Sequence, residues 1–323
     1  MTANAPIVVV GAGVSGLTTG VELLRAGLPV RVVAEEIPGR TSLAAGAMWG
    51  PYLVEPWAKV RAWSLVSLAV FQQLAESAET GVRMMSGVEA SRHPVEVPPW
   101  SELLPEFRTC DPAALLPGFV SGHRFTVPLV DMPVYLDYLR RRFLELGGEI
   151  ETHRVQALSE FESAIAVVNC AGLGAGELAD DLSVRPIRGQ HVVVENPGIT
   201  EFFSEDTGMS PDLVCFYPHG TTVVLGGTAI DGDGSLTKDE AAAKGIVERC
   251  AVIDPRLADA RIVEHRVGAR PTRPEVRVES TRRADGVPVV HNYGHGGAGV
   301  TLSWGCAQEV RDLIGDVLNE RRG

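Results

Sequence analysis

The sequence predicts an α/β fold in which a helix-covered sheet built from βαβ units is interleaved with a second, mostly antiparallel β-sheet. Residues 6–34 have the pattern of a strand, a glycine-rich turn, a helix and a second strand. Residues 287–319 repeat the order strand, glycine-rich turn, helix, whereas residues 188–227 hold short runs rich in Val, Tyr, Phe and Thr separated by turns. A chain of 323 residues is long enough for two such units.

Composition and charge exclude several classes of protein. Hydrophobic residues make up 45% of the chain and charged residues 22%, as in ordinary globular proteins. The net charge of −12 opposes binding to nucleic acid, because phosphate backbones are bound by clustered Lys and Arg. The N-terminal apolar run has no basic residue before Arg25 and is interrupted by Gly, Ser and Thr, which fits neither a secretion signal nor a membrane span. We expect a soluble, cytoplasmic protein with no membrane or nucleic-acid partner.

The elements of the first half follow from apolar spacing and from start and stop signals. After the first glycine-rich turn a helix extends to Arg25, and a strand covers residues 28–34. Apolar residues at helical spacing predict helices over 57–78 and over 131–147. The proline-rich stretch between them, 91–130, predicts irregular connections with short strands. The apolar run 164–169 predicts another strand of the first sheet.

The second half is predicted in the same way. Residues 188–195 and 214–227 predict strands of a separate, mostly antiparallel sheet. A strand at 287–292, a turn at 294–299 and a helix at 302–318 end the chain. The five cysteines are widely spaced and include no Cys-x-x-Cys pair, so we expect reduced, mostly buried thiols. We assign no metal, because glycines rule out a helix carrying His291 and His295 as a zinc pair.

Gly11-x-Gly13-x-x-Gly16 stands between a predicted strand and a predicted helix, the context that gives this pattern its meaning. Gly11 permits the tight turn, Gly13 lets the backbone approach a pyrophosphate, and Gly16 permits close helix packing. The positive end of the helix favours the anion. Glu35, at the end of the next strand, can accept hydrogen bonds from a ribose diol. These features indicate a dinucleotide site and leave the choice between NAD and FAD open.

The second glycine-rich stretch favours a flavin. Residues 291–301 (HNYGHGGAGVT) lead into a helix, so their amides and the helix dipole can stabilise negative charge on a large ring system. A reduced flavin is such a ring. An NAD-dependent dehydrogenase is the weaker alternative, because it does not account for this stretch.

Several stretches resemble the D-amino-acid oxidase family, and they occur in the family's order along nearly the whole chain. The C-terminal glycine-rich stretch, continued by Ser303-Trp304-Gly305-Cys306, looks like the family's C-terminal signature. The other similar stretches are residues 44–52 (AAGAMWGPY), 168–172 (VNCAG), 188–190 (RGQ) and 267–274 (VGARPTRP).

The resemblance implies a Rossmann-like FAD-binding domain interleaved with a mostly antiparallel substrate-binding domain. We assign residues 1–50, 130–182 and 285–323 to the first domain and residues 51–129 and 183–284 to the second. The implied reaction is FAD-dependent oxidative deamination of D-amino acids, by hydride transfer from the substrate α-carbon to flavin N5. Oxygen reoxidises the flavin, giving hydrogen peroxide, and the imino acid hydrolyses to a 2-oxo acid and ammonia.

By the same resemblance, Arg270 binds the substrate carboxylate bidentately and the carbonyl of Gly297 orients the substrate amine. An arginine held in an internal ion pair is the alternative for Arg270 and Arg273. Tyr217 is the candidate hydroxyl that shares the carboxylate, although a gapless match places Cys215 at the family's tyrosine position. Tyr52 is expected to line the pocket. The family's lid corresponds to residues 196–213, which lack its other tyrosine.

Cofactor contacts carried over from the family form three groups. They are Gly11, Gly13, Val14, Ser15, Gly16 and Glu35 for the ADP part; Thr41, Ser42, Gly46, Ala47 and Met48 for pyrophosphate and ring; and Val155, Gly172, Gly296, Gly297, Gly299, Val300 and Thr301 for later contacts.

Two further readings stay open beside this one. A related flavin amine oxidase would act on D-aspartate, glycine or N-methyl amino acids, and an acidic substrate would need an extra cation at the side-chain end of the pocket. A non-catalytic flavin-binding protein would hold Arg270 in an ion pair. The C-terminus ends Glu-Arg-Arg-Gly and lacks a Ser-Lys-Leu peroxisomal address, which favours the cytoplasm. The oligomeric state is left open, with a homodimer as one option.

Overall fold

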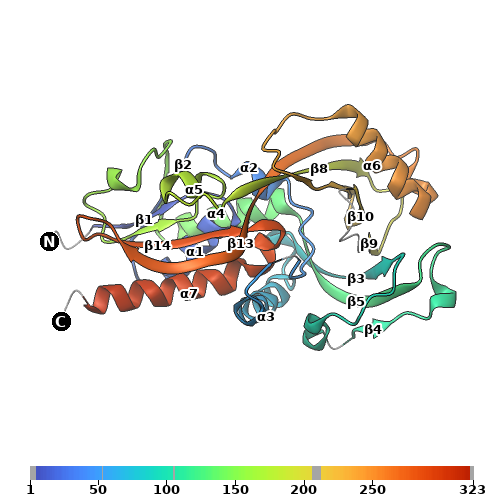
Figure 1. Ribbon diagram of the computed structural model, residues 1–323, viewed down its shortest axis with the longest axis horizontal. Coiled ribbons are helices and arrows are strands. Elements are labelled where there is room, and N and C mark those ends of the chain that lie inside the picture. The colour runs from blue at the N-terminus through green and yellow to red at the C-terminus, as the bar shows by residue number, and fades with distance from the viewer. Residues whose placement is uncertain (1–4, 53, 105, 206–211, 321–323) are drawn as a thin grey trace.

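The structure is a computed structural model that describes residues 5–52, 54–104, 106–205 and 212–320, and it has the predicted α/β architecture (Figure 1). Its helices are α1 (Val14–Arg25), α2 (Arg40–Leu43), α3 (Trp57–Leu74), α4 (Met132–Glu145), α5 (Gly174–Leu178), α6 (Glu240–Ile253) and α7 (Gly299–Glu320). Its strands are β1 (Ile7–Val10), β2 (Val30–Ala34), β3 (Val82–Ser91), β4 (Arg108–Thr109), β5 (Ser121–Val130), β6 (Glu149–Thr152), β7 (Val167–Asn169), β8 (Arg185–Glu195), β9 (Phe202–Glu205), β10 (Asp212–His219), β11 (Thr222–Thr228), β12 (Ile230–Asp231), β13 (Ile262–Arg282) and β14 (Pro288–His295).

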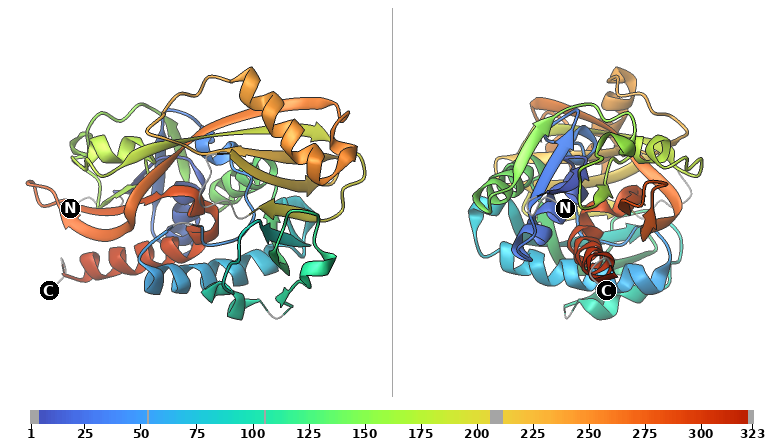
Figure 2. Two further views of the ribbon diagram at one scale, coloured as in Figure 1. Left: turned by 45° about the vertical axis from the view of Figure 1, so that its right-hand side comes forward. Right: turned by 90° about the vertical axis from the view of Figure 1, so that its left-hand side faces the viewer.

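One part of the sheet is parallel, with the strand order β14-β7-β1-β2-β6. All four residues of β1 are buried, as expected for a strand covered on both faces. On one face α1 packs against α4 and α7, and α3 lies beside α7 (Figure 2). On the other face Leu158 and Phe161 cover Val8 and Val10. The carboxyl end of β1 and the start of α1 therefore meet at one edge of this layer, where a nucleotide can bind.

The antiparallel part is joined to the parallel part edge to edge, so the expectation of a separate sheet is wrong. Strand β13 has 21 residues; its C-terminal half pairs with β14, and its N-terminal half pairs with β8. The path then continues through β11, β10, β9, β3, β5 and β4. Because β13 runs through both parts, the middle of β13, including Arg270, lies where they join. The division of the chain into two domains stays a prediction.

One long strand, β5, lies where irregular connections with short strands were expected, and its partner β3 lies in a stretch for which no element was predicted. Strands β3 and β5 pair with each other over ten residues each. Polar residues interrupt β3, and Pro128 within β5 removes one backbone donor without ending the strand. Helix α6 was also missed, although Asp239 caps it by accepting a hydrogen bond from the backbone N–H of Ala242. Helix α6 packs on β8, β10 and β11.

The remaining expectations on thiols and membrane segments can be compared directly with the structure. All five cysteines are free thiols; four are buried and Cys110 is half-buried, as predicted. Within the described parts of the chain no helix is both long and apolar enough to cross a membrane.

Candidate active site

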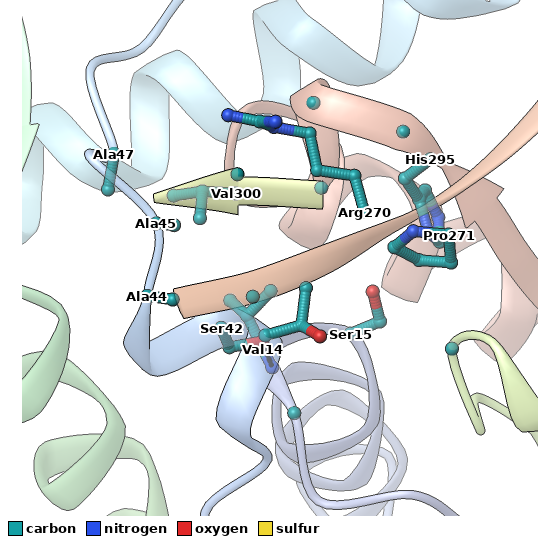
Figure 3. Close-up of a pocket in the computed structure, with 18 of the residues that line it drawn as sticks. Val14, Ser15, Ser42, Ala44, Ala45, Ala47, Arg270, Pro271, His295 and Val300 are labelled. Carbon is teal, nitrogen blue, oxygen red and sulfur yellow. Dashed lines mark hydrogen bonds between the residues drawn. The ribbon is translucent and has the colours of Figure 1, made fainter. Parts of the chain in front are cut away.

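A cavity of about 830 Å³ lies where the two parts of the sheet join. Its lining comes from the turn after β1, the segment 34–52, the loop after β7, strands β8, β10 and β13, and the start of α7. Figure 3 shows Ser42, Arg270 and Val300 from three of these segments around it. A volume in this range holds a drug-sized or larger ligand with most of its surface buried. The predicted cofactor and substrate residues all line this cavity except Gly16.

The glycine pattern forms a tight cradle at the start of α1. Gly11 has φ +110°, and a Cβ there would lie 2.3 Å from the carbonyl oxygen of Cys170. A Cβ on Gly16 would lie 1.9 Å from the carbonyl oxygen of Gly11, which explains why Gly16 packs behind the cavity. The backbone N–H of Val14 donates to Ser42 Oγ at 3.0 Å, so the segment after β2 is tied to the helix start. This backbone leaves room for an anion at the positive end of α1.

Residue Glu35 follows β2 directly and lines the cavity, as the fingerprint predicts. Its side chain is 62% exposed and lies 3.8 Å from Arg154 Nε. The carboxylate is accessible to a ribose diol, and its contact with the cofactor stays a prediction.

Segment 41–50 is held in place by contacts from distant strands and from α7. Thr41 Oγ1 donates to the carbonyl of Ala269 at 3.1 Å. Thr301 Oγ1 both donates to the carbonyl of Gly50, at 3.0 Å, and accepts from its N–H, at 3.1 Å. Ala47 has φ +55°, an uncommon conformation for a residue with a Cβ. Segment 41–50, which is predicted to contact the flavin ring, is therefore fixed at both ends.

Sequence reasoning missed His191, although a lone histidine in an apolar strand was a signal. Its Nδ1 donates to the carbonyl of Ala44 at 2.8 Å, and its ring lines the cavity. Burial and the nearby charge of Arg270 lower the pKa of His191 to about 4. At neutral pH it is an uncharged ring that positions the segment beginning at Ala44.

The side chain of Arg270 is a half-buried cation that points into the cavity (Figure 3). One guanidinium nitrogen, Nη1, donates to the carbonyl of Thr228 at 3.1 Å. The guanidinium lies over Gly189, where a Cβ would come within 2.6 Å of it. Burial lowers the pKa of Arg270, and the described residues give it no ion pair. A half-buried cation without an ion pair, inside a cavity, is suited to binding an anionic ligand group.

Arg273 lies three positions after Arg270 in β13. It forms an internal ion pair, as the alternative reading of these arginines describes. Its Nε lies 2.8 Å from an Asp181 carboxylate oxygen, which also accepts from Tyr293 at 2.8 Å. Arg277 contacts both Asp181 and the Tyr293 hydroxyl. Burial alone would raise the pKa of Asp181, but hydrogen bonds from Ser183, Tyr293 and Arg273 outweigh it and hold that pKa well below its usual range.

We expect Asp181→Asn to lower the free energy of unfolding by about 2–4 kcal/mol at pH 7, because it leaves Arg273 without its partner. The folded-state pKa of Asp181 is depressed, so its stabilisation is present above its ordinary pKa and is lost as the pH falls below it. The difference between wild type and variant should therefore shrink below about pH 4. Urea denaturation at several pH values measures this, with the exposed neighbour Asp180→Asn as control.

The two candidate side chains of β10 both line the cavity, as strand alternation predicts for Cys215 and Tyr217. Tyr217 is 8% exposed, and burial raises its pKa well above the ordinary value. Its hydroxyl is hydrogen-bonded with the side chains of Ser204 and Cys215. Whether Tyr217 shares a substrate carboxylate stays a prediction.

Gly297 and Tyr52 lie beside Arg270. A Cβ on Gly297 would be 3.4 Å from Tyr52 Cδ1 and 3.9 Å from Arg270 Cδ. Tyr52 is 43% exposed and lines the cavity. The structure thus brings three of the predicted substrate residues together from three separate segments of the chain.

The expected lid, residues 196–213, is only partly within the described chain, because residues 206–211 lie outside it. Its described part contains β9, which pairs with β10 and with β3. Residues 202–205 are therefore strand within the sheet, and the expectation of a lid there is wrong. The rest of that expectation stays a prediction.

Buried neutral histidines should make stability depend on pH. Burial is the main cause that lowers the pKa of both His191 and His295 to about 4. Their folded-state pKa values are depressed, so the unfolded chain binds more protons below about pH 6.5, and stability is lost between pH 6.5 and 4. Each contributes up to about 1.4 kcal/mol per unit of pKa difference. Urea midpoints measured over this range should fall as the pH is lowered. Midpoints that do not change with pH would contradict the conclusion that these histidines are buried and neutral.

The chemistry of this cavity is that of a nucleotide cofactor site beside an anion-binding arginine. No group of three or more potential metal ligands occurs among the described residues. The glycine cradle, the positive end of α1 and the long continuous cavity fit a dinucleotide such as FAD.

Comparison with known proteins decides between the cofactors. The profile of the FAD-dependent oxidoreductase family, DAO, matches residues 6–313. The chain belongs to this family. Its cofactor is therefore FAD, and the alternative of an NAD-dependent dehydrogenase is set aside.

Relatives of this family member cover almost its full length. It is 46% identical to a D-amino-acid oxidase of Rubrobacter xylanophilus over 98% of this chain and 97% of the relative. It is 46% identical to a D-amino-acid oxidase of Streptomyces coelicolor, over 96% of this chain and 97% of the relative. A human D-aspartate oxidase is 34% identical over 99% of this chain and 97% of its own length.

Among solved structures, glycine oxidase from Geobacillus kaustophilus has a TM-score of 0.80 at 18% identity, covering 97% of this chain and 95% of that one. L-α-glycerophosphate oxidase from Mycoplasma pneumoniae, with FAD bound, has a TM-score of 0.77 at 16% identity, covering 96% of this chain and 94% of that one. These likenesses confirm the predicted fold.

Proposed function

We propose that this protein oxidises D-amino acids to 2-oxo acids, with oxygen as acceptor and with release of ammonia and hydrogen peroxide. The observation that carries the proposal is Arg270, a half-buried cation without an ion pair among the described residues, inside the cavity beside Gly297. The two relatives at 46% identity are D-amino-acid oxidases, which supports the same reaction.

In this proposal Arg270 binds the substrate carboxylate. A planar guanidinium offers two parallel N–H donors to the two oxygens, which fixes the orientation of the substrate as well as holding it. Nη1 is already oriented by the carbonyl of Thr228. The burial that makes an unpaired cation costly strengthens its attraction for the substrate anion, because little water competes.

The amine and α-carbon are oriented from the other side. The carbonyl of Gly297 accepts from the substrate amine, and Tyr52 packs beside it and limits where the substrate can lie. FAD, when bound, would supply the acceptor for the α-hydrogen as hydride and the route of the two electrons to oxygen. The protein contributes position and electrostatics, and no side chain is required to remove the α-proton. Water then hydrolyses the imino acid to the 2-oxo acid and ammonia.

Acidic substrates fit the cavity less well than neutral ones. D-Aspartate needs a second cation, yet the other arginines that line the cavity, Arg40 and Arg154, lie beside Glu36 and Glu35 at the nucleotide end. We therefore place neutral and basic D-amino acids ahead of D-aspartate. The free thiols suit a reducing compartment, which supports a cytoplasmic location.

Oxygen consumption and peroxide formation test the proposed function. The purified protein, supplied with FAD, should respond to D-alanine and not to L-alanine. A response to glycine or D-aspartate that exceeds the response to every neutral D-amino acid would contradict the proposal and favour a related amine oxidase.

A further inference from the structure

One wall of the cavity contains a line of paired residues that crosses six strands. Pairing partners lie side by side on one face of a sheet, so their side chains point the same way. Starting from β8, His191 is opposite Gly226, Gly226 opposite Cys215, and Cys215 opposite Ser204. Ser204 is opposite Glu89, and Glu89 is opposite His123. We name this line the cross-sheet row: His191, Gly226, Cys215, Ser204, Glu89 and His123.

The cross-sheet row faces the cavity at five of its six positions. Every member except Gly226 lines the cavity, so a single cavity reaches from Arg270 to Glu89. The Arg270 guanidinium lies over Gly189 of β8, at the start of the row. The cavity therefore has the Arg270 cation at the β8 end of the row and the Glu89 carboxylate near the other end.

The other charges around Glu89 do not provide a cation for a second substrate carboxylate. Arg124 neighbours His123 along β5 but forms an ion pair with Glu201, and Arg92 forms one with Glu205. Glu205 itself lines the cavity and adds a second carboxylate. Toward Tyr217 of β10, Glu89 acts as a negative charge.

We propose that Glu89 selects D-amino acids with long basic side chains, by accepting charge-assisted hydrogen bonds from the side-chain ammonium or guanidinium while Arg270 holds the carboxylate. This inference rests on the proposed function and names its substrate class. Oppositely charged ends of the cavity match a substrate that is anionic at the α-carboxylate and cationic at the side-chain end. The net charge of −12 adds a long-range attraction for cationic substrates.

Length matters as well as charge. Neighbouring strands lie roughly 4.8 Å apart, so the four strand steps from β8 to β3 separate His191 from Glu89 by about 19 Å along the sheet. The Arg270 guanidinium lies over Gly189 at the β8 end of this span, and Glu89 lies at its β3 end. A lysine side chain extends about 6 Å beyond the α-carbon, over five bonds of roughly 1.5 Å. Alanine and aspartate side chains end well short of Glu89, and aspartate would also bring a like charge.

The experiment compares kcat/KM for D-arginine and D-citrulline, which have the same length but differ in charge. We expect the wild-type enzyme to favour D-arginine about 10- to 100-fold, as for a charge-assisted hydrogen bond. Glu89→Gln should bring this ratio close to one. The matched control is Glu106→Gln, which removes an exposed carboxylate that does not line the cavity and should keep the wild-type ratio. A wild-type ratio near one, or a ratio unchanged in Glu89→Gln, would overturn the inference.

A binding measurement keeps the test independent of turnover and of the variant's folding. The oxidised flavin spectrum of the wild-type enzyme reports binding of 6-aminohexanoate and of hexanoate, neither of which has an α-amine to oxidise. The first has the carboxylate-to-ammonium spacing of lysine and should bind at least 10-fold more tightly. Equal affinities would overturn the inference. Oxidation of D-alanine without a preference for basic substrates would contradict this inference alone, whereas failure with every D-amino acid would overturn the proposed function too.

Discussion

Replacing Arg270 with leucine is expected to lower kcat/KM for D-alanine by a factor of roughly 30 to several thousand. This corresponds to a loss of about 2–5 kcal/mol of transition-state stabilisation. The guanidinium is the cation that the described residues place in the cavity without an ion pair, and leucine offers the substrate carboxylate no donor. The remaining cavity would then bury an unpaired carboxylate, which is the larger part of the cost.

Thermal stability should not fall together with activity. A half-buried charge without an ion pair adds no stability to the folded protein, so Arg270→Leu should leave the melting temperature unchanged or raise it. Arg266→Leu is the matched control: it lies on the same strand, pairs with Glu264 and does not line the cavity. The control should keep its kcat/KM. Wild-type kinetics in Arg270→Leu would show that Arg270 does not bind the substrate carboxylate.

Replacing Gly16 with alanine is expected to abolish measurable FAD binding, with an affinity loss of at least about 100-fold. The new Cβ would lie 1.9 Å from the carbonyl oxygen of Gly11, so the cradle has to move. Because this variant can also fail to fold, Gly13→Ala is the sharper test. Its Cβ would meet Ser42 Oγ at 3.0 Å and no other atom as closely, so the chain is expected to fold while the pyrophosphate is pushed away.

Titration of the apo protein with FAD measures both variants. Gly13→Ala should raise the FAD dissociation constant about 10-fold or more, through the lost close approach of backbone to phosphate. Gly315→Ala, in α7, meets no atom within 4 Å and should bind FAD normally while gaining up to about 1 kcal/mol of stability. Normal FAD affinity in Gly13→Ala would mean that the cofactor does not lie on this cradle.

Local signals predicted the nucleotide end of the molecule well. The strand β1, the start of α1 and the end of β2 at Glu35 follow from short-range patterns, and the structure places each as expected. These features are readable because each depends on residues within one turn or one strand. The β3–β5 pair was missed because its stability comes from partners about 40 positions apart, which no local pattern records.

The substrate end depended on contacts between distant residues. Nothing near Arg270 or Arg273 in the sequence tells which of them is paired, since Asp181 lies 92 positions from Arg273. The resemblance to D-amino-acid oxidases singled out Arg270. In the structure Arg273 is paired with Asp181, whereas the described residues give Arg270 no ion pair. Glu89 and His191 were missed because they reach the cavity through strand register, which the sequence alone does not provide.

The most direct test of the account is an anaerobic absorption spectrum of the FAD-loaded protein before and after addition of D-alanine, with L-alanine as control. Without oxygen, electrons taken from the substrate stay on the flavin, so the spectrum reports cofactor, reaction and handedness together. The account predicts that D-alanine bleaches the oxidised-flavin band and that L-alanine leaves it unchanged. A flavin band that neither enantiomer changes, or that L-alanine bleaches equally, would contradict it.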